Sequence, residues 1–196
     1  DKFFFFFYIP WPKYWPDCSF PIVAKPSDMS GSSGVHVIND ASEMVKFEKS
    51  IDNKKENWVI QEYLSGPSYS MEVIGFNGNY LTLQTTEIIV DRMYDCKRVI
   101  APLNIPLAVD QELRDITLRI AKLMDLNGIM DVEVIDTGKG LRVLEIDARL
   151  PSQTPTAVYK STGINMLEVL AKVFVYKELK LSDWEIDVKR HVIYEH

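Results

Sequence analysis

Apolar and polar residues alternate along several short stretches of the chain, which is the pattern of half-buried β-strands. The clearest examples are residues 129–135 and 141–147, which flank a Thr-Gly-Lys-Gly turn. Asn77-Gly78 is a strong hairpin signal between two more such stretches. The other strands predicted from this pattern are residues 20–26, 35–38, 58–64, 69–76, 81–90 and 188–196.

Apolar residues at helical spacing predict helices at residues 41–51, 110–126 and 163–176. Asp40 and Glu43 match a capping box at the start of the first helix. The second helix is expected to be capped by Asp110 and to end before Gly128. The expected apolar faces are Met44, Phe47 and Ile51; Leu113, Ile116, Ile120 and Leu123; and Met166, Leu167, Leu170, Val173 and Phe174.

The order of these elements mixes strands and helices, and hairpins dominate. Residues 91–106 and 149–155 are predicted to be loops, and Pro10, Pro12 and Pro16 predict irregular backbone before the first strand. The fold class is therefore predicted to be α+β with a mainly antiparallel sheet.

Composition and charge exclude several classes of function. The net charge of -6 over 196 residues argues against nucleic-acid binding through a general basic field. Cys18 and Cys96 suggest no disulfide framework, which favours a reducing, cytoplasmic location. No apolar run approaches the roughly 20 residues of a membrane span. The run Phe3–Phe7 has no physical explanation, and the absence of an initiator methionine suggests that an N-terminal part is missing.

The hairpin at 129–147 carries acids at unusual positions. A three-residue loop, 138–140, would pair Thr137 with Leu141 and so place Glu133 opposite Glu145 and Asp131 opposite Asp147. Directly opposed like charges destabilise a strand pair by up to ~1 kcal/mol, and a hard cation with oxygen ligands would offset this cost. A solvated acidic face is the alternative, and a slip of one residue in register would remove the argument.

Two further positions have open interpretations. Lys25 lies near the end of a strand that precedes the Gly/Ser loop 27–34. This arrangement can bind phosphates, but it can also be an ordinary hairpin loop with a surface lysine. No GxxxxGK[ST] motif is present. Glu72 lies inside an apolar strand, so it is either exposed at a sheet edge or functional. The histidines show no ligand spacing, and we find no Ser/His/Asp or Cys/His set.

Taken together, the motifs resemble those of the ATP-grasp family of carboxylate–amine ligases, and they occur in that family's order. The matching segments are Asp1-Lys2, Phe20–Pro26 with its Gly/Ser loop, Gln61–Leu64, Glu133 within 128–134, and Leu144–Arg149.

This resemblance implies a fold of two α+β subdomains that clasp ATP, with residues 1–19 leading into a small subdomain at 20–75 and a large one at 76–196. An N-terminal Rossmann-like domain would be absent from this chain. The implied phosphate-binding residues are Lys2, Lys25, Ser30, Gly31, Ser32 and Ser33. The implied adenine-binding residues are Gln61, Glu62, Tyr63 and Leu64. The implied Mg2+ ligands are Glu133, Glu145 and Asp147, and the implied catalytic residues are Arg149 and Lys25.

A narrower resemblance points to the branch of the family that acts in pyrrolysine biosynthesis. It rests on Tyr94–Cys96, Gly128–Val134, Gly140–Arg149, Pro151–Pro155 and Ile193–His196. It implies that 3-methylornithine is activated by ATP and joined to the ε-amine of L-lysine, with Ser70, Glu72, Asp147 and Arg149 contacting the methylornithine. Another amino-acid or dipeptide ligase, or a nucleotide-binding fragment without turnover, remains an alternative.

Overall fold

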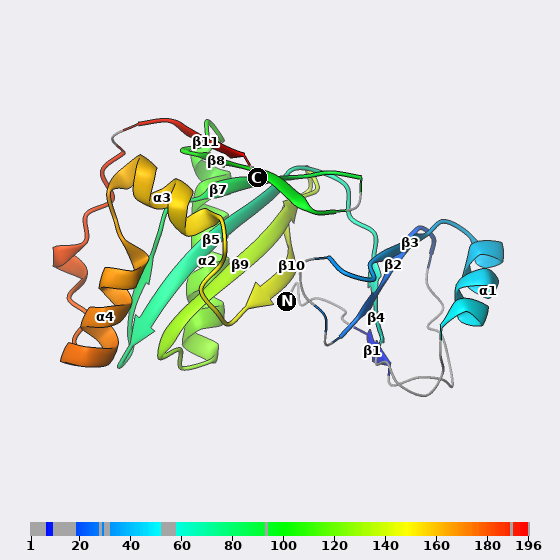
Figure 1. Ribbon diagram of the computed structural model, residues 1–196, viewed down its shortest axis with the longest axis horizontal. Helices are drawn as coiled ribbons and strands as arrows, with labels where there is room; N and C mark the ends of the chain where they lie inside the picture. The colour runs from blue at the N-terminus through cyan, green and yellow to red at the C-terminus, as the bar shows by residue number, and fades with distance from the viewer. Residues whose placement is uncertain are drawn as a thin grey trace. The chain divides into compact units, whose positions relative to one another are not determined.

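The computed structural model describes residues 7–9, 19–27, 29, 32–51, 58–92, 94–188 and 190–195 (Figure 1). The chain forms two compact units, Asp1–Leu64 with Asp91–Asp95, and Ser65–Val90 with Cys96–His196. The division between Leu64 and Ser65 falls before the strand β5, Ser68–Phe76, and the boundary at 75/76 that the resemblance implied falls inside this strand.

The first unit contains a four-stranded antiparallel sheet of order β1-β4-β2-β3 and one described helix. The bounds are β1 Phe7–Ile9, β2 Ile22–Pro26, β3 His36–Ile38, β4 Trp58–Glu62 and α1 Ala41–Ser50. Asp40 caps α1 by accepting hydrogen bonds from the backbone N–H groups of Ser42 and Glu43, as predicted.

Burial alternates along β2, so the sheet of the first unit has two distinct faces. One face packs into a core with α1 made of Ile22, Ala24, Ile38, Met44, Phe47, Trp58 and Ile60. The other face carries Val23 and Lys25, which are half-buried.

The second unit is built on a larger, entirely antiparallel sheet of order β10-β9-β5-β7-β8-β11, with β6 also paired to β5. The strands are β5 Ser68–Phe76, β6 Asn79–Thr82, β7 Thr86–Val90, β8 Cys96–Ala101, β9 Gly128–Asp136, β10 Leu141–Asp147 and β11 Val192–Glu195. The helices are α2 Leu107–Leu123, α3 Thr154–Thr162, α4 Met166–Tyr176 and the short 3-10 helix η1 Leu181–Asp183.

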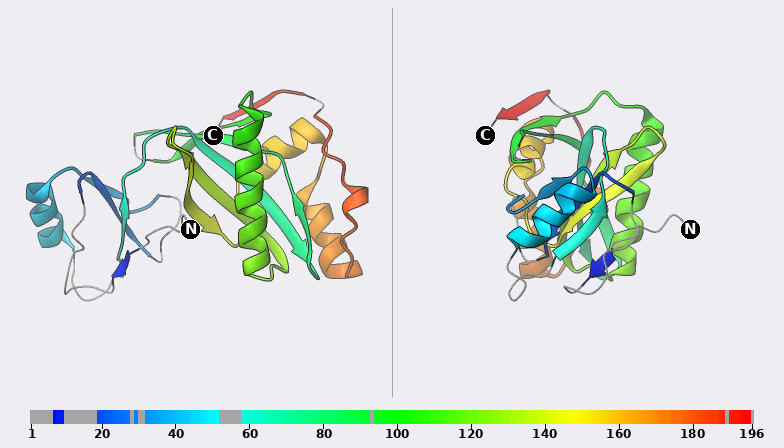
Figure 2. Two further views of the ribbon diagram at one scale, coloured as in Figure 1. Left: turned by 180° about the vertical axis from the view of Figure 1, so that it is seen from behind. Right: turned by 90° about the vertical axis from the view of Figure 1, so that its right-hand side faces the viewer.

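Helices cover both faces of this sheet: α2 lies on one face, and α3 and α4 lie on the other (Figures 1 and 2). The core on the α3/α4 side includes Ile74, Leu81 and Leu83 from the strands. The helical residues that meet them are Val158, Met166, Val169 and Val173. The predicted α+β class with antiparallel sheets is confirmed.

Some predicted elements differ from the structure. The expected loop 91–106 contains β8, whose alternation is hidden by Lys97 and Arg98, and the expected loop 149–155 leads directly into α3. The proline in that segment, Pro155, lies in the first turn of the helix, where a missing N–H costs nothing.

The second predicted helix begins earlier and faces differently than expected. It starts at Leu107, so Asp110 lies in its first turn rather than at its cap, and Gly128 begins β9 instead of ending the helix. Leu123, assigned to the buried face, is 74% exposed. The buried residues of α2 are Leu113, Thr117 and Ala121, which follow one another at intervals of four and so share one face of the helix.

The predicted strand 81–90 is two strands, β6 and β7, both paired to β5 and separated by Leu83, Gln84 and Thr85. Among the described residues, no helix is long and apolar enough to span a membrane.

Candidate active site

The β9–β10 hairpin brings acids together in the predicted pairs. Glu133 lies opposite Glu145 and Asp131 opposite Asp147. The predicted turn is wrong by one residue, because Asp136 rather than Thr137 pairs with Leu141. A bulge between Val143 and Glu145 adds one residue to β10 and restores the expected pairing of the acids.

β5, on the other side of β9, adds two more polar side chains to the same face. Ser70 lies opposite Glu133, and Glu72 lies opposite Asp131. Since directly opposed residues of a strand pair point to the same face, three adjacent strands carry one continuous polar surface on the α3/α4 side. Ile74 of β5, two residues beyond Glu72, packs in the core on that side.

Glu72 is the most unusual member of this surface. Its side chain is fully buried, and neither carboxylate oxygen has a hydrogen-bond partner among the described residues. The alternative of an edge-exposed Glu72 is therefore wrong, because β5 is paired on both sides at this level. A carboxylate placed in this way costs folding free energy, which indicates a functional position.

Burial and mutual repulsion shift the pKa values of two of these acids. Burial raises the pKa of Glu72, and the charge of Asp131 raises it further. The Thr154 hydroxyl is near enough to lower this pKa, although it makes no hydrogen bond of normal geometry. Burial also raises the pKa of Asp131, while the hydrogen bond from Ser70 opposes that rise.

The remaining site residues are tied together by short polar contacts. The Ser70 hydroxyl donates to Oδ1 of Asp131. Nη2 of Arg149 donates to Oδ2 of Asp147 at 2.6 Å, and Arg149 is half-exposed. The charges of Asp147 and Arg149 both act on Asp131, with opposite effects on its pKa. These contacts, with the pairing of Glu72 and Asp131, join five residues in one cluster: Ser70, Glu72, Asp131, Asp147 and Arg149.

Glu133, Glu145 and Asp147, the predicted magnesium ligands, share this face and are half-buried. Within the described ranges, no three His, Cys, Asp or Glu side chains converge closely enough to form a metal site by themselves. Magnesium usually binds through one or two carboxylates together with phosphates and water, rather than in a cage of protein ligands. The donor set therefore fits a magnesium ion that arrives with a nucleotide.

In the first unit, Lys25 and Gln61 lie on the same face of the sheet. Val23, the neighbour of Lys25 on that face, is paired with Gln61, and Lys25 itself is paired with Val59. This is the face that α1 does not cover. Glu62 ends β4, and Tyr63 donates its backbone N–H to the carbonyl oxygen of Pro21.

The Gly/Ser loop is described only in part, because Ser30 and Gly31 lie outside the described residues, as does Lys2. Ser32 has a positive φ of 58° and donates its hydroxyl to the carbonyl oxygen of Tyr94 at 2.8 Å. Gly34 has a φ of 76°, and a Cβ there would come within 2.9 Å of the Pro26 ring, so this turn requires glycine. Ser33 is exposed beside it.

The sequence pattern indicated no role for Thr154 or Gln84, and it indicated Asp131 only as one of the opposed acids of the hairpin. The pairing of Asp131 with β5 becomes visible only in the sheet. Thr154 and Gln84 are buried and their side chains include polar atoms without partners among the described residues. The sequence carries no signal for such burial, because both residues lie in segments predicted as loop or as uninterrupted strand.

Comparison with known proteins identifies the family of the chain. The model of the ATP-grasp domain family matches residues 11–153. The 3-methyl-D-ornithine–L-lysine ligases of Methanosarcina mazei and Methanosarcina acetivorans are each 39% identical to the chain over 90% of its length, and the match covers 44% and 45% of them. The chain therefore spans less than half the length of these relatives.

Solved structures share the fold at low sequence identity. The biotin carboxylase domain of Hydrogenobacter thermophilus 2-oxoglutarate carboxylase has a TM-score of 0.78 at 19% identity, covering 89% of this chain and 41% of that one. An L-amino acid ligase from Bacillus licheniformis has a TM-score of 0.75 at 21% identity, covering 91% of this chain and 45% of that one. Since the family model matches well over half of the sequence, the chain belongs to the ATP-grasp domain family.

Proposed function

We propose that the protein is an ATP-dependent carbon–nitrogen ligase that joins the carboxylate of 3-methylornithine to the ε-amine of L-lysine. The observation that carries the proposal is the polar face shared by β5, β9 and β10, where paired acids lie beside a buried Glu72. The 39% identity to 3-methyl-D-ornithine–L-lysine ligases supports the choice of substrates.

The chemistry requires activation of a carboxylate, which is a poor electrophile at neutral pH. Transfer of the γ-phosphoryl group of ATP gives an acyl phosphate and ADP; the amine then attacks the acyl carbon and phosphate leaves. Phosphoryl transfer depends mainly on positioning and on neutralisation of charge. A bound magnesium ion would supply part of that neutralisation, with Glu133, Glu145 and Asp147 as the residues available to hold it.

The first unit would bind the nucleotide. Lys25 provides a positive charge for the phosphate oxygens, with Lys2 as a second candidate, and the backbone of residues 30–34 provides N–H donors. Segment 61–64 would receive the adenine through its backbone groups. A related structure from Hydrogenobacter thermophilus contains MgADP, which supports nucleotide and magnesium binding in this fold.

The second unit would bind the amino acid that is activated. Arg149 has a planar guanidinium that can donate two parallel hydrogen bonds to a carboxylate or an acyl phosphate. Asp147 holds this guanidinium from one side at 2.6 Å. Ser70 and Glu72 would contact the methylornithine, and the buried carboxylate of Glu72, unpaired within the described ranges, suits an ammonium group.

The decisive experiment is mass spectrometry of the product that the protein forms from ATP, magnesium, 3-methylornithine and lysine, with ADP release measured in parallel. We expect one amide product whose mass is the sum of both amino acids minus water. A panel of other amino-acid pairs serves as the control. Product from a different pair alone would assign the protein to another ligase, and nucleotide binding without any ADP release would overturn the proposal.

A further inference from the structure

A hollow of about 250 Å³ opens at the C-terminal end of α3, within the second unit. Its lining residues are Tyr159, Lys160, Gly163 and Arg190. Two of these residues are cationic and none is acidic, although the whole chain has a net charge of -6. A concave surface lined by one sign of charge concentrates ions of the opposite sign, so the hollow is suited to an anion.

Arg190 is held against the last turn of α3 by its backbone. Its N–H donates to the carbonyl oxygen of Ser161 at 3.3 Å, and the Ser161 hydroxyl donates to the carbonyl oxygen of Arg190 at 3.0 Å. Ser161 is fully buried, so these two hydrogen bonds fix the backbone of Arg190 beside the helix. The fold thus brings together Arg190 and Lys160, two cations that lie far apart in the sequence.

The ordinary role of a cation at this place is to offset the negative end of a helix dipole. Carbonyl groups in the last turn of α3 already have partners, however. The carbonyl oxygen of Tyr159 accepts a hydrogen bond from the Gly163 N–H at 2.8 Å, and that of Val158 accepts one from a threonine hydroxyl at 2.8 Å. Within the part of the chain that the structure describes, neither Lys160 nor Arg190 forms an ion pair with a carboxylate. Both charges are therefore available to a ligand.

The size and the chemistry of the hollow define its ligand. Its volume is below the roughly 300–1,000 Å³ of sites that hold drug-sized molecules, so a small anion fits it. An arginine can donate two parallel hydrogen bonds to a phosphate or a carboxylate, and a lysine adds a point charge. We propose that Lys160 and Arg190, with Tyr159, form a binding site for a small oxyanion, the group that inorganic phosphate and carboxylates share.

This site is separate from the cluster around Glu72. Thr154, near Glu72, is the first residue of α3, whereas the hollow lies at the last turn of that helix. The nine residues of α3 span about 13 Å at 1.5 Å per residue. The inference therefore goes beyond the proposed ligase activity, and each proposal can fail without the other.

Nuclear magnetic resonance can follow binding at this position, because Gly163 lines the hollow and its backbone amide gives a signal of its own. The nucleotide-free protein is titrated with inorganic phosphate and, in a second series, with acetate, both at constant ionic strength. The same titrations are made with Arg190→Gln and with the double variant Lys160→Gln/Arg190→Gln. Both side chains are exposed, so these variants should fold as the wild-type protein does, which circular dichroism checks.

Two further variants serve as controls. Lys122→Gln removes an exposed cation from the last turn of α2, so it reproduces the loss of a charge at the end of a helix. Arg149→Gln removes a cation of the candidate active site, where phosphate is also expected to bind. Neither substitution should change the response of the Gly163 signal to phosphate by more than twofold.

We expect phosphate to shift the Gly163 signal to saturation in the wild-type protein. Arg190→Gln should weaken this binding about threefold or more, and the double variant about tenfold or more, because each removes a charged donor. Tighter binding of phosphate than of acetate would assign the site to phosphate groups, and the reverse order would assign it to carboxylates. A Gly163 signal that responds to neither anion, responds equally in the double variant, or no longer responds in Arg149→Gln would overturn the inference.

Discussion

Glu72 is held in the middle of the larger sheet at a cost to the fold. Burial destabilises the charged form of its carboxylate, which accepts no hydrogen bond from the part of the chain that the structure describes, and Asp131 on the neighbouring strand increases that penalty. Natural proteins keep such residues where function requires them, and they lose stability as a result. The sequence showed only an acid in an apolar strand. Burial distinguishes a functional acid from a surface acid here, and this burial is provided by helices that lie far along the chain.

The stability of the protein should depend on pH, because the pKa of Glu72 is raised. Burial raises this pKa from 4.5 to about 8, so the folded protein binds a proton that the unfolded chain has released. The free energy of unfolding should therefore fall as the pH rises between these two values. Glu72→Gln should reduce this slope and stabilise the ligand-free protein by about 1–3 kcal/mol at the upper end, measured by urea denaturation.

Glu87→Gln is the matched control, because Glu87 lies half-buried on the adjacent strand β7. The same variants test function, since Glu72→Gln should lose affinity for the amino acid while Glu87→Gln should not. An unchanged pH slope in Glu72→Gln would contradict the assignment of the titrating group.

Glu145 should be required for turnover. Removing a carboxylate from the pair with Glu133 should remove a magnesium ligand, so Glu145→Ala should lower ADP formation at least ~100-fold while the circular dichroism spectrum stays unchanged. Glu195→Ala is the control, because Glu195 is an exposed acid on the edge strand β11 and forms an ion pair with Arg98 of β8. Normal turnover by Glu145→Ala would remove the support for metal binding at this position.

At the scale of elements, two bulges set the positions of the site residues. The bulge in β10 brings Glu145 opposite Glu133, and the interruption between β6 and β7 lies opposite Glu72. Alternation in the sequence predicted the strands but neither bulge, because an extra residue changes the pairing without changing the residue types around it. The acid pairs were predicted correctly only because the error in the turn and the bulge cancel.

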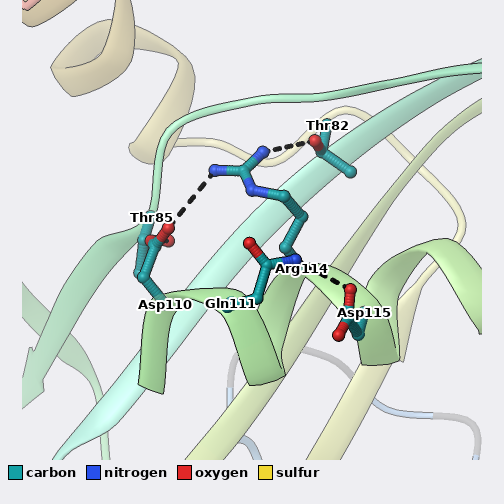
Figure 3. Close-up of polar contacts among 6 residues, drawn as sticks. All are labelled: Thr82, Thr85, Asp110, Gln111, Arg114 and Asp115. Atoms are coloured by element: carbon teal, nitrogen blue, oxygen red, sulfur yellow. Dashed lines mark hydrogen bonds and ion pairs between the residues drawn. The ribbon is translucent and has the colours of Figure 1, made fainter. Parts of the chain in front are cut away.

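A polar network on α2 holds the second of these bulges. Arg114 donates to the Thr82 hydroxyl and pairs with Asp110, which accepts a hydrogen bond from Thr85 (Figure 3). Arg114→Met should therefore lower the free energy of unfolding by about 1–2 kcal/mol, measured by chemical denaturation. Because the network fixes the bulge opposite Glu72, the variant should also weaken amino-acid binding more than ATP binding.

The control for Arg114→Met is Gln111→Met on the same helix, which removes an exposed hydrogen bond to Asp115. This change should alter stability by no more than ~0.5 kcal/mol. Equal effects of the two substitutions would show that the network does not anchor the bulge.

At the scale of the whole molecule, the order of motifs was sufficient to predict the fold class and both sheets. The packing of α3 and β8 was missed because local pattern is weak there: charged side chains conceal the alternation of β8, and Pro155 suggests a loop although it lies in the first turn of a helix. The site depends on such segments, since Thr154 belongs to α3. What remained hidden was therefore the part of the site that long-range packing assembles.

The two units should differ in stability, because their sheets are covered differently. The sheet of the second unit has helices on both faces, whereas the described helix of the first unit packs on one face and leaves Lys25 half-buried on the other. Hydrogen–deuterium exchange should therefore be slowest in β5 and β9 and faster in β2 and β4. Added ATP with magnesium should slow exchange in β2 and β4, because ligand binding stabilises the folded state by mass action. Lys25→Ala should reduce this protection and leave the nucleotide-free exchange of β5 and β9 unchanged; equal protection in both proteins would exclude Lys25 from the nucleotide site.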